Sequence, residues 1–171
     1  MKAILVDSSS AILLYKSGWL NPTLNQFRLF TGQAASRELT VPGYPGAAHF
    51  QRLFEQGEIK VLPVDAAQTH RDDALETMGA GESGCIRHFL GGVGDFLLLD
   101  DGRAAAYCRA RKIPYVNALL MPRILALGDD AIAPPTVADA MGRIYALGRY
   151  APWVRDHACR LSDAALAPFR P

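Results

Sequence analysis

The chain opens with a short apolar run that ends abruptly in polar residues. The run Lys2-Ala3-Ile4-Leu5-Val6 is followed by Asp7 and three serines, and a second apolar stretch begins at Ala11. An uninterrupted apolar run of this length is typical of a strand that is buried on both faces of a parallel sheet. Serine favours the N-terminus of a helix. We therefore predict a buried strand, a turn at residues 7–10 and then a helix.

The same alternation of strand-like and helix-like segments continues along the chain. Further strands are predicted near residues 27–30, 58–64, 95–99 and 113–116, and further helices at 33–40, 47–56, 65–79, 82–90, 103–111, 118–127 and 136–150. Pro63 places the end of its strand near an edge of the sheet or in a loop. Strands separated by helices predict crossover connections, and hence a three-layer α/β/α fold with a mostly parallel sheet.

The length of the chain favours a single folding unit. It has 171 residues, half of them hydrophobic, which is enough for one core and leaves little room for two. We predict one domain over residues 1–150. The apolar pattern weakens beyond that point, so residues 151–171 are expected to form a C-terminal tail.

Cysteine usage and hydropathy indicate the compartment. Cys85, Cys108 and Cys159 are odd in number and contain no CxxC pair, which disfavours both a disulfide framework and a zinc knuckle. No apolar run approaches the roughly 20 residues that span a bilayer. The apolar start meets Asp7 too early to be the core of a signal peptide. A cytoplasmic protein is therefore expected.

The charge balance leaves nucleic-acid binding to local patches. Lys and Arg total 18 against 17 for Asp and Glu, a net charge of +1. Basic residues gather around the later acidic segments, at Arg87, Arg103, Arg109, Arg111 and Lys112. Such a group could contact an RNA backbone, and solvated helix faces explain it nearly as well.

Acidic residues follow the predicted strands at the edge where parallel sheets build their sites. Asp7 follows the first strand, Asp100 and Asp101 follow the fourth, and Glu82 opens a helix after a glycine turn. The carboxyl ends of central parallel strands lie side by side, so these side chains are expected to converge. Carboxylates about 5 Å apart repel by roughly 3 kcal/mol at an effective dielectric near 20, which favours a bound Mg²⁺ or Mn²⁺ ion. Taken singly, each acid could instead cap a helix or complement its dipole.

Three blocks of sequence, taken in order, resemble the PIN domain family. They are Ile4 to Ser9, Gly81 to Ile86, and Leu97 to Ala105 with Lys112 to Val116 behind it. The resemblance spans roughly residues 1–127. It implies a sheet edge with three or four acids that bind Mg²⁺ or Mn²⁺ and hydrolyse RNA phosphodiester bonds. Many bacterial members are VapC-type toxins that pair with a small antitoxin protein.

The resemblance also implies roles for individual acids. Carried over by position, the catalytic acids are Asp7, Glu38, Glu82 and Asp101. The metal ligands are Asp7, Glu82, Asp100 and Asp101. Glu38 stands for the acid that in the family follows the second strand on a helix. The sequence departs from the family pattern there, because a clear strand and a proline before Glu38 are missing.

Three hypotheses on function follow. The leading one is a Mg²⁺- or Mn²⁺-dependent endoribonuclease, either a toxin or a solitary enzyme. The second is a degenerate PIN-like module that binds RNA or a protein without cleavage. The third is another aspartate-centred enzyme such as a phosphotransferase, although Asp7-Ser8-Ser9 lacks the DxD spacing of haloacid-dehalogenase-like phosphatases.

A homodimer is predicted as well. PIN-like domains often pair, and the apolar helices near residues 47–54 and 138–147 exceed what one small sheet needs.

Overall fold

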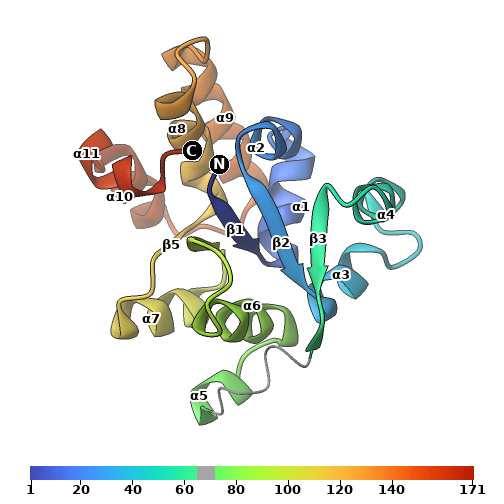
Figure 1. The fold of residues 1–171 in the computed structure, drawn as a ribbon. Helices are drawn as coiled ribbons and strands as arrows, with labels where there is room; N and C mark the ends of the chain where they lie inside the picture. Colours follow the sequence, from blue (N-terminus) through green and yellow to red (C-terminus); the bar gives the residue numbers. More distant parts are fainter. Residues whose placement is uncertain (65–71) are drawn as a thin grey trace.

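A five-stranded sheet with every neighbouring pair parallel forms the centre of the computed structural model, which describes residues 1–64 and 72–171 (Figure 1). The strand order is β3-β2-β1-β4-β5. The strands are β1 (Ala3–Val6), β2 (Arg28–Gly32), β3 (Ile59–Leu62), β4 (Phe96–Leu98) and β5 (Tyr115–Val116). The predicted α/β class is confirmed. Pro63 follows an edge strand, as expected.

Helices connect the strands and cover the sheet. They are α1 (Ser8–Ser17), α2 (Leu20–Gln26), α3 (Gln33–Leu39), α4 (Ala47–Glu55), α5 (Asp73–Glu76), α6 (Ala80–Leu90), α7 (Gly102–Arg111), η2 (Ala118–Leu120), α8 (Met121–Gly128), α9 (Pro134–Leu147), α10 (Pro152–Arg160), α11 (Asp163–Leu166) and η3 (Ala167–Phe169). Among the described residues, no helix combines the length and apolarity that crossing a bilayer requires.

The two faces of the sheet bury two separate groups of side chains, which makes the fold three-layered. On β1, Ile4 and Val6 pack with residues of α1, α2, α8 and α9, whereas Leu5 packs with residues of α6 and α7. Successive side chains of a strand point to opposite faces, so a wholly apolar strand must be covered on both sides. Figure 1 shows α6 and α7 together on one side of the sheet. The apolar run that opens the chain is therefore the centre of the whole core.

Most predicted segments match an element, with shifts of a few residues at their ends. The clearest change is α2, which no pattern predicts because its sequence LNPTLNQ buries only Leu20 and Thr23. The helix expected over 65–79 is represented by the short α5, and residues 65–71 of that prediction lie outside the described residues. Asp7, and not one of the serines, is the N-cap of α1.

Residues 151–171, expected as a tail, fold onto the first core group. Ala158 of α10 and Leu166 of α11 are 1% exposed. The ring of Phe169 lies edge-on to Phe96 of β4, with centroids 5.1 Å apart. Arg123 of α8 donates to the backbone carbonyl of Ala158 at 2.8 Å. The C-terminal helices therefore belong to the same folded unit as the sheet.

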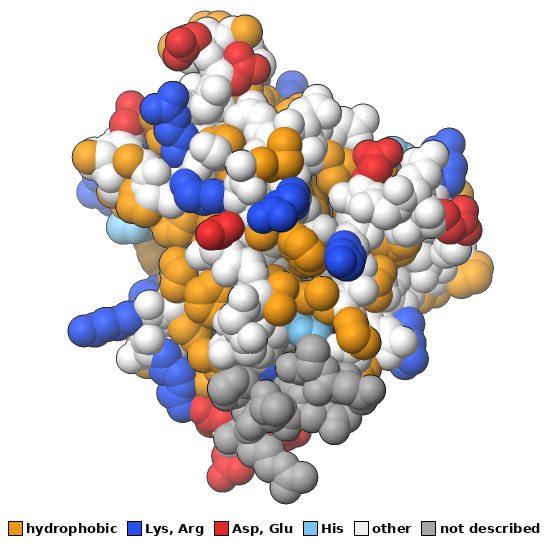
Figure 2. All heavy atoms as spheres, viewed as in Figure 1, with side chains coloured by type: hydrophobic (Ala, Val, Ile, Leu, Met, Phe, Trp, Pro, Cys, Tyr) orange, Lys and Arg blue, Asp and Glu red, His pale blue; other side chains and the backbone are white. Residues whose placement is uncertain are grey.

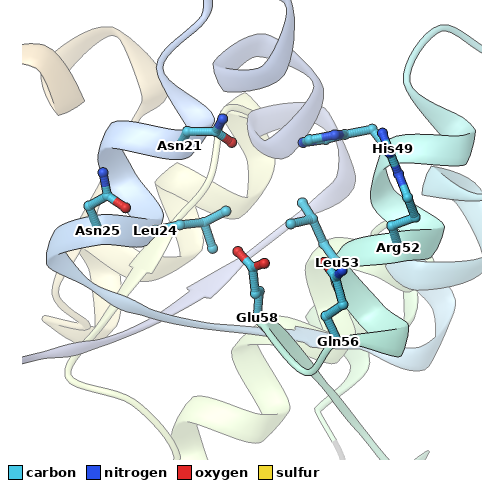
Figure 3. A pocket seen from close by; sticks show the side chains of 8 residues that line it. All are labelled: Asn21, Leu24, Asn25, His49, Arg52, Leu53, Gln56 and Glu58. Atoms are coloured by element: carbon cyan, nitrogen blue, oxygen red, sulfur yellow. The ribbon is translucent and has the colours of Figure 1, made fainter.

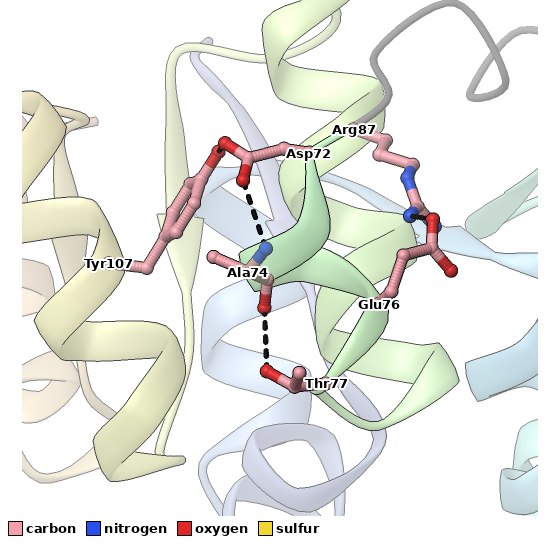
Figure 4. A network of polar contacts seen from close by, with 6 residues as sticks. All are labelled: Asp72, Ala74, Glu76, Thr77, Arg87 and Tyr107. Carbon is pink, nitrogen blue, oxygen red and sulfur yellow. Dashed lines mark hydrogen bonds and ion pairs between the residues drawn. The ribbon is translucent and has the colours of Figure 1, made fainter.

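A polar network ties the short helix α5 to its neighbours (Figure 4). Asp72 caps α5 and accepts a hydrogen bond from the Tyr107 hydroxyl at 2.9 Å. Asp72 also pairs with Arg111, so α5 is fastened to α7. Glu76 pairs with Arg87 of α6. The network joins α6, whose first turn carries the predicted acid Glu82, with α7, whose N-cap is the predicted acid Asp101.

Candidate functional site

Asp7 is fixed at the carboxyl end of β1, the central strand. Its side chain is 1% exposed and accepts hydrogen bonds from the Ser10 amide and the Ser9 hydroxyl, each at 2.8 Å. Burial, and then the negative charge of Asp100, raise the pKa of Asp7 to about 7. A buried carboxylate beside a second carboxyl group is costly to ionise, which is the electrostatic signature expected of an acidic binding site.

Asp100 follows β4 and is held from three directions. It accepts hydrogen bonds from the Ser10 hydroxyl at 2.6 Å, from the Ala118 amide at 3.2 Å and from the Tyr150 hydroxyl. Burial raises its pKa. Ser10 joins the two acids, because its amide donates to Asp7 while its hydroxyl donates to Asp100.

Asp101 is the N-cap of α7. Its Oδ1 accepts the amides of Arg103 at 2.9 Å and Ala104 at 2.8 Å. The helix-capping role considered for the acids from the sequence is thus real for Asp101, as it is for Asp7. Over the described part of the chain, Oδ2 of Asp101 accepts no hydrogen bond, so one oxygen is left for a ligand.

Glu38 and Glu82 approach from the second and third crossovers. Glu38 lies on α3, and its Oε2 accepts a hydrogen bond from the Ser8 hydroxyl. The first turn of α6 packs against this pair, since a Cβ atom at Gly81 would lie 3.6 Å from that oxygen. Glu82 folds back over Gly79, where a Cβ atom would clash with its Oε2.

A buried thiol lies beneath three of the acids. Cys85 of α6 is fully buried and its Sγ donates to the carbonyl oxygen of Val6, the last residue of β1, at 3.4 Å. Burial raises the pKa of Cys85 most, and the negative charges of Asp7, Glu82 and Glu38 raise it further. The Cys85 thiol therefore lies close enough to all three carboxylates for their charges to raise its pKa. The thiol stays protonated there, as a small neutral group that adds no charge.

The three serines that open α1 each bind a different predicted acid. Ser8 donates to Glu38, Ser9 to Asp7 and Ser10 to Asp100. Consecutive helical residues point about 100° apart, so three hydroxyls in a row reach outward in three directions. Acids from α3, β1 and β4 are thereby attached to one helix N-terminus. The serines were expected as helix caps, and this wider role has no signal in their sequence beyond their number.

A pocket of about 550 Å³ opens beside this arrangement. The acids that line it are Glu82, Asp100 and Asp101. Its remaining wall comes from α1 and the end of α9, through Ser9, Ile12, Leu13, Lys16, Leu147, Gly148, Arg149 and Tyr150. Asp7 and Glu38 lie outside this lining: Asp7 accepts a bond from Ser9, which lines the pocket, and Glu38 accepts one from the neighbouring Ser8.

A second pocket, of about 420 Å³, contains none of the predicted acids. Its side chains come from facing turns of α2 and α4, with Glu58 next to β3 (Figure 3). Glu58 precedes β3, so this pocket belongs to the amino ends of the strands. The predicted chemistry therefore concentrates at the opposite, carboxyl edge of the sheet.

The donor atoms at the carboxyl edge are all oxygens, which suits a hard divalent cation such as Mg²⁺ or Mn²⁺. Within residues 1–64 and 72–171, however, no three His, Cys, Asp or Glu side chains are placed together as a set of metal ligands. The serine hydroxyls direct Glu38, Asp7 and Asp100 to protein partners, and Glu82 lies folded back over Gly79. The acids lie at the same edge of the sheet, but among the described residues no three of them surround one common point.

Comparison with known proteins gives this chain no relatives: no family model, curated protein or solved structure matches it. Its function must therefore be argued from its own side chains and from their arrangement at the sheet edge.

Proposed function

We propose that this protein is a Mg²⁺- or Mn²⁺-dependent endoribonuclease that hydrolyses RNA phosphodiester bonds. One observation supports the proposal most: the serine run of α1 attaches Glu38, Asp7 and Asp100 to one edge of a parallel sheet. These acids are separated by up to about ninety residues of sequence, as the Ser10–Asp100 bond illustrates. Carboxylates gathered in this way repel one another, and with Asp7 buried among them the arrangement is costly without a bound cation.

The residues have distinct tasks in this proposal. Asp7, Glu82 and Asp101 would hold the ion. Asp100, whose carboxylate already accepts bonds from Ser10, Ala118 and Tyr150, would keep Ser10 and hence Asp7 in place. A bound divalent ion supplies an activated water and offsets charge on the phosphorus. With no ion bound, Asp7 takes up a proton near neutral pH, so the ion and the proton compete for it.

A second candidate function is a degenerate module that binds RNA or a protein without cleavage. The observation in its favour is that no three metal-ligating side chains lie together among the described residues. Glu82, one of the acids expected to bind an ion, is turned back toward Gly79. A measurement of ion binding distinguishes the two functions, because the nuclease should bind a divalent cation and the degenerate module should not.

Partners and compartment follow from the same proposal. An RNA strand is the substrate, and a small antitoxin protein would be the partner of a toxin. The buried thiols of Cys85 and Cys108 suit the reducing cytoplasm that we propose as the compartment.

The test is a thermal melt with and without Mg²⁺ or Mn²⁺, alongside cleavage of a generic single-stranded RNA. At an ion concentration 100 times Kd, mass action stabilises the wild type by about 2.7 kcal/mol. Asp7→Asn should lose most of that shift and the cleavage. Asp139→Asn, an equal charge change at an exposed position of α9, should keep both. Equal ion-induced shifts in wild type and Asp7→Asn, or undiminished cleavage, would reduce Asp7 to a helix cap.

A further inference from the structure

Two basic side chains line the same pocket as the acids. Lys16 lies in the last turn of α1, and Arg149 lies in the segment between α9 and α10. Both are exposed. Across the described residues, the ion pairs involve other bases, so neither Lys16 nor Arg149 is neutralised by Glu82, Asp100 or Asp101. Opposite charges thus share one pocket without pairing.

The pocket extends along α1 as far as Lys16. Ser9, Ile12, Leu13 and Lys16 are spaced as i, i+3, i+4 and i+7, so the pocket runs along one face of α1. At about 1.5 Å of rise per residue, Lys16 lies roughly 10 Å along the helix axis from Ser9, which bonds Asp7. The acids are at one end of a groove and the lysine is at the other.

The wall between the two ends is apolar. Ile12 and Leu13 of α1 are only partly buried, and Leu147 at the end of α9 is 46% exposed. A groove with acids at one end, cations along its rim and aliphatic side chains between them has the features that contact a nucleic-acid strand. Lys and Arg bind phosphate oxygens, and apolar surface accepts bases and riboses.

The face seen in Figure 2 carries no continuous basic surface that could bind a nucleic-acid strand in place of the pocket. Lys and Arg side chains there lie among acidic, polar and hydrophobic ones, so no single sign of charge covers it. With a net charge of +1 on the whole chain, binding of a polyanion has to come from a few placed bases.

We propose that Lys16 and Arg149 bind the phosphate backbone of single-stranded RNA and lay the strand along α1 toward the acids. The proposal rests on the proposed function for the choice of RNA as the ligand. A groove that extends roughly 10 Å from the acids to Lys16 is longer than a single nucleotide, so the site takes an oligonucleotide and not a mononucleotide. Lys16 and Arg149 act as binding residues, away from the reacting atoms.

The experiment measures the affinity of a 5′-labelled single-stranded RNA dodecamer by fluorescence anisotropy, in chelator, between 50 and 200 mM salt. Each phosphate contact on a single strand contributes about 0.7 to the slope of log affinity against log salt. Lys16→Ala with Arg149→Ala should therefore reduce the slope by about 1.4. Lys16→Arg with Arg149→Lys keeps both charges and should retain the slope.

The matched control is Arg28→Ala with Lys60→Ala. Both residues are exposed, and the pairing of Lys60 with Phe30 puts them on the sheet face that α6 and α7 cover, opposite α1. The control removes the same two charges and should leave the slope unchanged. Equal losses in the test and control variants, or no RNA binding by the wild type, would overturn the proposal.

Failure of the proposed function gives a different result. In that case Mg²⁺ and Mn²⁺ neither stabilise the protein nor support cleavage, while the salt slope still depends on Lys16 and Arg149. The protein would then be an RNA-binding module that does not cleave. Far-ultraviolet circular dichroism of each variant checks that a lost slope comes from lost charge and not from unfolding.

Discussion

At the scale of single residues, the serine run is what gathers the acids. Ser10 is fully buried and bonds both Asp7 and Asp100, whereas Ser9 is exposed and bonds only Asp7. Water can take the place of an exposed hydroxyl that is removed, whereas it cannot easily reach the site of a buried one, so losing a buried hydroxyl costs more. The two serines should therefore differ in their effect on stability.

Ser10→Ala should lower the melting temperature more than Ser9→Ala. Asp100 loses the donor that comes from the fully buried Ser10, at a cost of about 1–2 kcal/mol, or roughly 2–8 °C in a chain of this size. Ser9→Ala removes a bond to the buried Asp7, but water can take the place of the exposed Ser9 hydroxyl, so this variant should stay near the wild type. Thermal melts of both variants at one pH make the comparison. Equal shifts would mean that the Ser10–Asp100 bond adds nothing.

Asp7 should make the ion-free protein less stable as pH rises. Its pKa of about 7 in the folded state exceeds the ordinary value of 3.8, so between those values the folded state holds the extra proton. Stability from this group is therefore lost as pH rises from about 4 to 7, and is flat above.

Asp7→Asn removes that dependence. In chelator at pH 8, the variant should melt roughly 2–8 °C above the wild type, about 1–2 kcal/mol, because a buried charge has been removed. At pH 5 the gap should close. Melting curves of both proteins from pH 5 to 8 provide the check, and parallel curves would contradict the assigned pKa.

At the scale of elements, the N-terminus of α7 offers a test of whether Asp101 only caps the helix or also binds a ligand. Asparagine caps a helix about as well as aspartate does, but it lacks the charge. Asp101→Asn should therefore keep the stability of the ion-free protein and weaken its stabilisation by Mg²⁺. Asp101→Ala should lose the cap, at about 1 kcal/mol or roughly 2–4 °C, together with the ion effect. Melts of both variants with and without ion decide this, and full ion stabilisation of Asp101→Asn would leave Asp101 as a cap alone.

The end of α9 differs from the prediction made from its sequence. The periodic pattern predicts a helix to Tyr150, but α9 ends at Leu147 and Gly148 leaves the helical conformation. That change lets the Tyr150 hydroxyl reach Asp100, and it places Arg149 at the pocket. Periodicity reports which face of a helix is apolar, and it says little about where the last turn opens. Tyr150 and Arg149 therefore could not be assigned to the site from their spacing.

At the scale of the whole molecule, the strands were predictable because a buried parallel strand needs an unbroken apolar run. Ala3–Val6 and Phe96–Leu98 meet that need on both faces of the sheet. The helix α10 could not be found in this way, since in its sequence PWVRDHACR only Ala158 is buried. The acids could be placed at one edge from topology. Their hydroxyl partners depend on side-chain directions that only the packed structure defines.

The apolar helices that suggested a homodimer are largely used by the chain itself. Phe50 of α4 and Ile144 of α9 are fully buried in the first core group. Outside the pocket, Trp153 of α10 is a large apolar side chain that stays 63% exposed. A homodimer should bury the surface around Trp153.

Trp153→Glu should therefore convert a homodimer to monomer, because a charge at an apolar contact stays desolvated when the contact closes. Tyr44→Glu is the matched control: Tyr44 is 62% exposed and lies in the loop before α4, so its change should leave the assembly intact. Sedimentation velocity at micromolar concentration measures both. A wild type that is monomeric throughout removes the homodimer prediction. A dimer that survives Trp153→Glu but not Tyr44→Glu moves the interface to α4.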